Sequence, residues 1–415
     1  MLHLLRSLTP NQRGAVIASY LGWTLDAFDF FILVFVLKDV AQEFHTDVET
    51  VTYAIFLTLA ARPVGALLFG LAADRYGRRA TLMVDILLFS MLEFASGLAQ
   101  SLTIFLILRL AFGVAMGGEW GVGAALAMET VPPGTRGVVS GILQTGYPSG
   151  YLLAAIIYFA LYGLLGWRGM FIIGALPALL VLYIRGKVEE SLAFLARAHA
   201  KLGAGLAKLP RIHAGRFLYV VLLMTAFNFL SHGTQDLYPA FLQLQRHFSQ
   251  HTVGIIAIVY NIGAILGGLL IGALSQRIGR RRAILVAALL TLPVIPVWAY
   301  GARPVTLAVG AFLMQFAVQG AWGVVPAHLN ELSPEDMRGT FPGFTYQIGN
   351  LLASANATLQ AGIAEANGGN YAFALATVAA IVAVTLAVLV LFGIEAHSVE
   401  FAGAQVYPDN GSPQP

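Results

Sequence analysis

The chain repeats itself at one fixed distance. Residues 70–79, GLAADRYGRR, align with residues 272–281, GALSQRIGRR, which begin 202 positions later. Three further pairs stand at the same distance: Trp120 and Trp322, Glu129 and Glu331, and Arg136 and Arg338. A single register that holds over separated blocks predicts two structurally similar halves arranged in parallel.

The composition indicates that these halves lie in a membrane. Of the 415 residues, 58% are hydrophobic and only 11% are charged, whereas soluble domains carry about 25% charged residues. We therefore expect an all-α integral membrane protein whose surroundings are the lipid bilayer.

Twelve segments are long and apolar enough to cross a bilayer core, which needs about 20 residues per helix. They are residues 15–38, 51–73, 80–99, 102–130, 137–164, 168–186, 216–243, 252–275, 282–300, 304–330, 339–364 and 370–393. Of the 24 Lys and Arg residues, 18 then fall on the side of both termini, four on the other side and two within spans. This bias predicts cytoplasmic termini in a multi-pass protein of the plasma (inner) membrane.

The spans divide into two pseudo-symmetric bundles of six helices, residues 1–186 and residues 216–393. Between them, residues 187–215 form the one long polar interruption, in which leucines accompany basic residues. This linker is either an amphipathic helix on the inner membrane surface or an irregular basic connection. Residues 394–415 form a polar tail, and we expect the protein to function as a monomer.

Several kinds of chemistry are excluded by absent residues. The chain has no cysteine, so it has no disulfide, zinc-thiolate site or thiol nucleophile. It also has no phosphate-binding loop, H-E-x-x-H motif or serine elbow. We therefore expect no enzyme activity, no ATP drive, no cofactor and no metal. No basic run is dense enough for nucleic acid.

One predicted span carries polar residues at spacings of three and four, which place them on one helical face: Asn228, Ser231, His232, Gln235 and Asp236. A charge at mid-membrane costs roughly 2.5–3.5 kcal/mol on insertion scales, so we expect this stripe to line a wet path. His232 and Asp236 lie one turn apart and are candidates for a pair that carries a proton. The plainer interpretation is a pair that only tethers helices.

Charged residues also occur inside the predicted spans of the first half. Asp26 and Asp29 are three positions apart, and two close carboxylates can force one to stay protonated, as proton uptake requires. Glu119 lies near mid-membrane. Arg62 and Arg109 are candidate anchors for a substrate carboxylate, because a guanidinium can bind it bidentately. Alternatively, each arginine pairs permanently with a buried acid.

Two larger sets complete the candidates. Polar residues that could line a cavity, or could merely form interhelical hydrogen bonds, are Gln144, Tyr147, Gln315, Gln319, Tyr346, Gln347 and Asn350. Charged residues next to helix ends, which we expect to act in gating, are Asp74, Arg75, Arg78, Glu129, Arg136, Glu331 and Arg338. Within the second set we expect Glu129 to act with Arg136, and Glu331 with Arg338.

Residues 70–79 resemble the loop 2–3 signature of the major facilitator superfamily, G-x-x-x-D-R-x-G-R-R, with a weaker copy in the second half. The resemblance implies a fold of twelve helices in two bundles, in which this loop helps to lock one conformation. Arg109 resembles the helix-four arginine that is tied to proton coupling in that superfamily.

The polar stripe resembles a narrower signature, N-x-x-S/T-H-x-S/T-Q-D-x-x-x-T, of the sialate:proton symporter family and especially of its lactate permease branch. Residues 228–236 match it throughout, and Ala240 replaces the final threonine. The resemblance implies proton-coupled uptake of a small monocarboxylate such as lactate or pyruvate. The sialic acid transporters lack the histidine, so His232 favours the monocarboxylate branch.

Other functions remain open at this stage. Sialic acid or another organic acid is an alternative substrate for symport. Residues 141–150 loosely resemble the Gly-Pro motif of antiporters, which leaves an exporter or antiporter as a further alternative. A receptor without transport activity would need a signalling domain, and no soluble segment exceeds about 30 residues.

Overall fold

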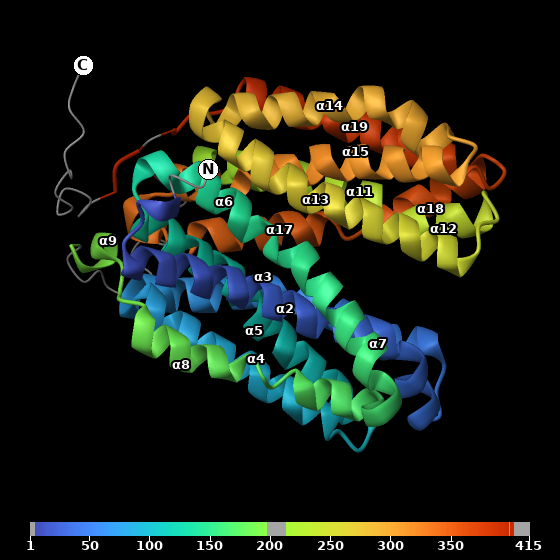
Figure 1. Cartoon of the computed structure of the whole chain (residues 1–415), viewed down its shortest axis with the longest axis horizontal. Coiled ribbons are helices and arrows are strands. Elements are labelled where there is room, and N and C mark those ends of the chain that lie inside the picture. Colours follow the sequence, from blue (N-terminus) through green and yellow to red (C-terminus); the bar gives the residue numbers. More distant parts are fainter. Residues whose placement is uncertain (1–4, 197–212, 398, 402–415) are drawn as a thin grey trace.

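The computed structural model describes residues 5–196, 213–397 and 399–401. All regular secondary structure in these ranges is helical. The helices form two bundles, one from each half of the chain, which lie one above the other in Figure 1. The all-α, two-bundle architecture predicted from the repeat is therefore confirmed.

The N-terminal bundle contains α2 (Pro10–Glu43), α3 (Val48–Tyr76), α4 (Arg78–Gly97), α5 (Leu102–Thr130), α6 (Arg136–Gln144), α7 (Gly146–Ile173) and α8 (Ala178–Lys187), followed by the short α9 (Leu192–Leu195). The C-terminal bundle contains α11 (Ala214–Gln235), α12 (Tyr238–Leu244), α13 (Gln250–Ile278), α14 (Arg280–Tyr300), α15 (Pro304–Trp322), α16 (Val325–Leu332), α17 (Phe341–Ala353), α18 (Asn356–Ala366) and α19 (Tyr371–Leu391). The predicted linker helix falls mostly on residues 197–212, which lie outside the described ranges.

Ten helical stretches in the described part are long and apolar enough to cross a membrane. The other two predicted spans are built from shorter pieces. The sixth consists of the end of α7 and α8, and the eleventh consists of α17 and α18. The predicted boundary between the fifth and sixth spans, between residues 164 and 168, coincides with a break inside α7 at Gly166, whose non-helical φ of 60° suits a residue without a side chain.

Local sequence signals explain where several helices begin. Thr9 caps α2 in a reciprocal capping box with Gln12, and Asp47 and Ser101 accept backbone N–H groups at the starts of α3 and α5. Gly77 and Gly279, 202 positions apart, separate α3 from α4 and α13 from α14 with φ of 105° and 92°. The same tight turn therefore occurs once in each bundle.

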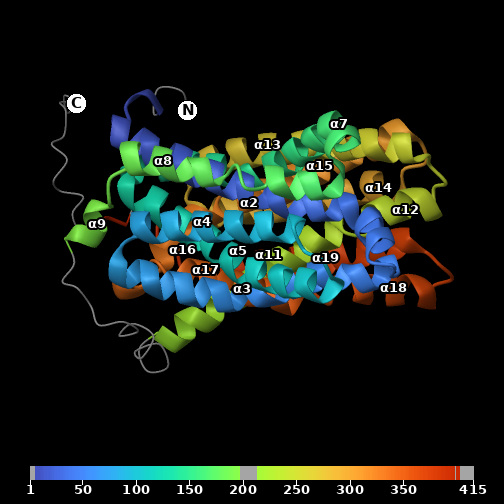
Figure 2. The ribbon, with the colours of Figure 1, turned by 90° about the horizontal axis from the view of Figure 1, so that it is seen from below.

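The two bundles meet at one end, which we call the basic end because Arg78 and Arg280 lie there. They diverge towards the opposite end, and the start of α2 and the end of α19 lie beside the basic end (Figure 1), which Figure 2 shows from another side. Glycines permit the close approach. A Cβ on Gly121 would lie 2.7 Å from Cα of Gly343, and one on Gly141 would lie 2.5 Å from the carbonyl oxygen of Gly268. Backbone thus packs directly on backbone between the bundles.

Candidate functional site

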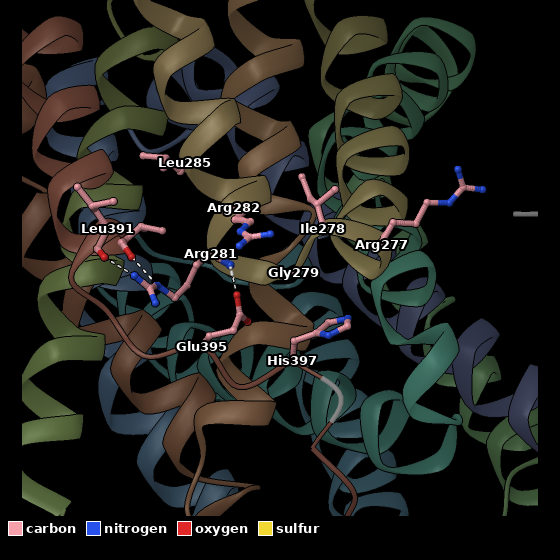
Figure 3. A pocket seen from close by; sticks show the side chains of 10 residues that line it. Arg277, Ile278, Gly279, Arg281, Arg282, Leu285, Leu391, Glu395 and His397 are labelled. Carbon is pink, nitrogen blue, oxygen red and sulfur yellow. Dashed lines mark hydrogen bonds between the residues drawn. The ribbon is translucent and has the colours of Figure 1, made fainter.

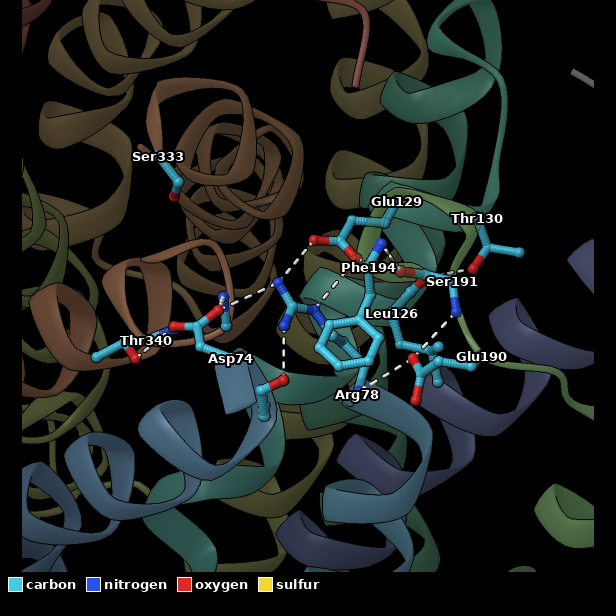
Figure 4. Close-up of polar contacts among 12 residues, drawn as sticks. Asp74, Arg78, Leu126, Glu129, Thr130, Glu190, Ser191, Phe194, Ser333 and Thr340 are labelled. Atoms are coloured by element: carbon cyan, nitrogen blue, oxygen red, sulfur yellow. Dashed lines mark hydrogen bonds and ion pairs between the residues drawn. The ribbon is translucent and has the colours of Figure 1, made fainter. Parts of the chain in front are cut away.

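A buried ion pair anchors the basic end of the N-terminal bundle. The Arg78 guanidinium donates to both carboxylate oxygens of Glu129, at 3.1 and 2.9 Å, and to the carbonyl oxygen of Ala73 at 2.6 Å (Figure 4). It also lies 3.2 Å from Asp74. This forked geometry satisfies most of the guanidinium donors inside the protein.

The C-terminal bundle repeats this arrangement at the equivalent positions. Arg280 donates to both oxygens of Glu331 at 2.9 Å, and to the hydroxyl of Ser275 at 2.9 Å. Glu129 and Glu331 therefore form forked ion pairs with Arg78 and Arg280, which the sequence analysis did not propose as their partners.

The local chain path explains the position of the Arg136 side chain. Residues 132–135 turn the chain between α5 and α6, which directs the Arg136 side chain across the seam between the bundles. There its Nη1 atom lies 3.8 Å from Glu331 of the opposite bundle. Arg136 also donates to the carbonyl oxygen of Met128 at 3.0 Å.

A carboxylate that follows each bundle caps the nearby helix. Glu190 accepts the backbone N–H groups of Arg78 and Arg79 at 3.0 and 3.1 Å, and Glu395 accepts those of Arg280 and Arg281 at 3.3 and 3.0 Å. Burial raises the pKa of the Glu190 carboxyl, and these backbone hydrogen bonds partly oppose that shift. The last helix of each bundle is thereby tied to the start of α4 or α14.

A reciprocal pair of contacts joins the bundles across the basic end. Asp74 accepts from the backbone N–H of Gly339 at 2.7 Å, and from the N–H and hydroxyl of Thr340 at 3.0 and 2.7 Å. In the reciprocal contact, Gln276 accepts the N–H of Gly137 at 2.9 Å. The two contacts are related by the repeat, but only the first uses a charged acceptor.

A third contact across the seam comes from the segment after α19. The Phe401 ring lies between two guanidinium carbons, 3.6 Å from that of Arg136 and 3.9 Å from that of Arg338. Arg136 also donates to the carbonyl oxygen of Val399. We call this contact the Phe401 bridge. Sequence analysis assigned the segment to a polar tail and missed the bridge, whose only signal was one aromatic residue beyond the last span.

His232 lies between two partners in the C-terminal bundle. Its Nδ1 is 3.1 Å from an Asp236 carboxylate oxygen, and its Nε2 is 2.9 Å from the Asn350 side-chain oxygen on α17. The His232 and Asp236 side chains remain 33% and 40% exposed. The predicted pair is therefore present and accessible, and it connects α11 to α17.

Amide and hydroxyl side chains extend this polar group towards α15. Gln235 donates to Gln315 at 2.8 Å, and Gln319 donates to the Ser231 hydroxyl at 3.2 Å. Asn228 differs, because it is buried and donates to the Met224 carbonyl of its own helix at 2.7 Å. The stripe thus divides into a networked part, from Ser231 to Asp236, and a buried residue one turn before it.

Aromatic rings pack together where the two bundles meet. The Tyr346 ring packs against Trp120 and Trp322, with centroids 4.8 and 5.3 Å away, so it contacts the two tryptophans that the repeat relates. Tyr147 packs on Trp23 at 5.4 Å. The neighbouring Gln347 is buried, and its side-chain oxygen has no hydrogen-bond partner among the described residues.

The interior of the N-terminal bundle holds a group of fully buried acids, the carboxylate cluster: Asp26, Asp29, Asp85, Glu93 and Glu119. Within the described ranges, the carboxylate oxygens of the four members other than Glu93 have no hydrogen-bond partner. Such groups are costly to bury as anions. The cluster therefore needs protons or cations to balance it.

Two arginines lie in the same bundle. Arg109 is 2.8 Å from Glu93, so in this structure it forms an ion pair with a buried acid. Arg62 is buried, donates to the Met116 sulfur at 2.8 Å and packs over the Phe30 ring. No carboxylate of the described residues forms an ion pair with Arg62.

Two bundles that close at one end and carry polar groups at their seam define a membrane transporter, not an enzyme. The chain belongs to the Major Facilitator Superfamily, whose family model matches residues 19–235 and 221–408.

Similar proteins agree with this assignment. The chain is 29% identical to the "Carboxylic acid transporter protein homolog" of Saccharomyces cerevisiae over 87% of its length, which spans 63% of the yeast protein. It is 26% identical to "Sialic acid transporter NanX" of Escherichia coli, with 83% of this chain and 85% of that protein covered. It is 30% identical to the "Probable 4-methylmuconolactone transporter" of Cupriavidus pinatubonensis, with 84% and 83% covered.

Among solved structures, the proton:xylose symporter XylE matches with a TM-score of 0.79 at 17% identity, covering 95% of this chain and 98% of that one. At this identity the match shows the fold alone.

Proposed function

We propose that the protein couples proton uptake to the import of a small monocarboxylate such as lactate or pyruvate. The observation that carries the proposal is His232, which is accessible and hydrogen-bonded between Asp236 and Asn350. Histidine is the side chain whose charge changes most readily near neutral pH. The names of the relatives, which include carboxylic acid and sialic acid transporters, support an organic acid as substrate.

Residues at the seam would bind the substrate. The carboxylate would bind Arg62, the buried guanidinium that has no carboxylate partner among the described residues, while Ser231, His232 and Gln235 orient it. Tyr346 would supply an aromatic wall, and Gln347 and Asn228 would line the inner limit of the site.

Protons would bind the His232–Asp236 pair and the carboxylate cluster, chiefly Asp26, Asp29 and Glu119. Arg109 would hold Glu93 in place and so influence coupling indirectly. A half-loaded carrier would have an uncompensated charge to desolvate, so only the empty or fully loaded form would change conformation.

The contacts at the basic end would form the gate. Asp74, Arg78, Arg136 and Arg338 lie in it, and Arg75 lies next to it. By the positive-inside rule, the basic end would face the cytoplasm of a plasma (inner) membrane protein with internal termini. The described conformation, closed at this end, would then be open to the outside, with His232 reachable from there. The protein would act as a monomer with boundaries near residues 186 and 216.

Uptake into proteoliposomes tests the proposal. One proton with one monoanion is electroneutral, so labelled lactate or pyruvate should follow the pH gradient, with about tenfold accumulation per pH unit, and ignore an imposed voltage. His232→Ala should abolish the coupled uptake, while His251→Ala, at an exposed histidine on α13, should not. Full pH-driven uptake by the His232 variant would refute the assigned role.

A larger organic acid is the second candidate, because relatives are named for sialic acid and 4-methylmuconolactone. Thermal shifts of the purified protein with lactate, pyruvate, sialic acid and dicarboxylates, at acidic and neutral pH, would distinguish these substrates. An antiporter would instead need a second substrate inside the vesicles before any uptake occurred.

A further inference from the structure

A basic pocket lies at the surface of the C-terminal bundle. It has a volume of about 600 Å³ and is formed by the turn between α13 and α14, the end of α19 and the segment that follows it (Figure 3). Its charged and titratable lining residues are Arg277, Arg281, Arg282, Glu395 and His397.

The pocket has an excess of cations. Both oxygens of Glu395 already accept backbone N–H groups of α14. Arg281 donates to the carbonyl oxygens of Val390 and Leu391 at the end of α19. Arg277 and Arg282, in contrast, are exposed and have no hydrogen bond or ion pair with any residue in the described ranges. Two guanidinium groups are thus available for an anion.

The same pocket has an apolar side. Ile278, Leu285 and Leu391 line it, and 53% of Leu391 remains exposed. Beyond the pocket, Phe392 is 82% exposed. The apolar lining therefore continues onto helix surfaces that face lipid in a membrane-spanning protein.

We propose that this pocket binds the headgroup of an anionic phospholipid. Its phosphate would lie beside Arg282, the Arg277 side chain, which points away from Arg282 in Figure 3, would turn towards it, and one acyl chain would follow the exposed surface of α14 and α19. Basic pockets between membrane helices are suited to such headgroups. A free phosphate would satisfy the two cations but would leave the adjoining apolar surface uncovered, so the lipid is the better match.

The repeat supplies a matched control. At the end of α8, the N-terminal counterpart of α19, Arg185 and Lys187 are also exposed cations. They lie outside the lining of this pocket. Removing this pair changes the net charge as much as removing Arg277 and Arg282 does.

The test is to count lipids on the delipidated full-length protein by native mass spectrometry during titration with phosphatidylglycerol or phosphatidylcholine. We expect the R277Q/R282Q variant to bind one phosphatidylglycerol about 30-fold more weakly than the unchanged protein. The R185Q/K187Q variant should bind it normally, R277K/R282K should largely restore binding, and phosphatidylcholine should not distinguish the proteins.

Equal loss in the two charge-matched variants would overturn the proposal, because net charge alone would then explain binding. Displacement of the lipid by inorganic phosphate at millimolar concentration would overturn the assignment to a lipid. An unchanged thermal midpoint of R277Q/R282Q in detergent would show that the weaker binding does not arise from misfolding. Transport is not measured, so the result is independent of the function proposed above.

Discussion

The forked ion pairs at the basic end of this protein are the same in both halves of the internal repeat, whereas the charged side chains of its interior differ. At the basic end, Arg78 and Glu129 correspond to Arg280 and Glu331, and the two forked pairs agree within 0.2 Å at each contact. In the interior, each charged side chain has an uncharged residue at its equivalent position. The repeated residues therefore form the ion pairs at the basic end of each bundle. The residues that differ between the two halves supply the charged groups of the interior.

Each bundle has charged interior residues whose counterparts in the other bundle are uncharged. At the distance of 202 residues, the charged positions Arg62, Asp85, Glu93, Arg109 and Glu119 correspond to Ala264, Ala287, Ile295, Ala311 and Ala321. Conversely, His232, Gln235 and Asp236 correspond to Phe30, Leu33 and Val34. One bundle thus carries the buried acids and the other the accessible imidazole with its amides, so the proposed coupling would need residues of both bundles.

The largest expected effect tests whether the two forked ion pairs at the basic end contribute equally to stability. Arg280→Ala leaves Glu331 buried without its main partner, which should cost about 3–5 kcal/mol of stability. Because the geometry is the same, Arg78→Ala should cost a similar amount. The measurement is thermal unfolding in detergent followed by tryptophan fluorescence. If either variant does not fold, Arg→Lys, which keeps the charge but loses the fork, serves in its place. Losses that differ by more than about 2 kcal/mol would show that the two forked ion pairs are not equivalent.

The next effect tests the interior. Replacing His232 with Gln should lower pH-driven uptake roughly 100-fold, the scale of a lost proton-transfer group. The folded amount of protein should not change, since His232 is partly exposed. Initial uptake rates over a range of pH are the measurement. A normal pH profile in this variant would instead assign proton binding to the carboxylate cluster alone.

A smaller effect separates the two contacts across the seam. Asp74→Ala removes a charged acceptor of three hydrogen bonds and should shift the balance towards opening at the basic end by about 2 kcal/mol, whereas Gln276→Ala should shift it by about 1 kcal/mol. The chain has no cysteine, so a single cysteine introduced at the seam reports opening through its labelling rate. Equal rates in the two variants would contradict the asymmetry.

The smallest effect concerns the Phe401 bridge. Phe401→Leu keeps an apolar side chain at this buried position but loses the two cation–π contacts, each worth at least about 0.5 kcal/mol. The same labelling assay should show a roughly fivefold faster reaction at the basic end. Phe392→Leu, at an aromatic residue that is 82% exposed, is the control and should react at the unchanged rate.

Much of the fold could be predicted from the sequence, because long apolar segments, a fixed repeat and capped helix starts are local signals. The His232–Asp236 pair was also local, since one helical turn separates the two residues. The arginine partners of Glu129 and Glu331 could not be predicted from such local signals. Each lies 51 positions from its arginine along the chain, and only the packing of α4 on α5, or of α14 on α15, brings them together. The Phe401 bridge depends on three segments at once and was missed for the same reason.

The Phe401 bridge has a consequence for the way the carrier moves. The ring is held by one arginine from each bundle, so it can follow only one of them when the basic end separates. The ten residues that follow Leu391, up to Phe401, can extend over about 35 Å, which is enough for the segment to accompany either partner. Each turnover would then break and remake a contact at the end of the described chain, and a fusion partner attached nearby would alter the rate of that step.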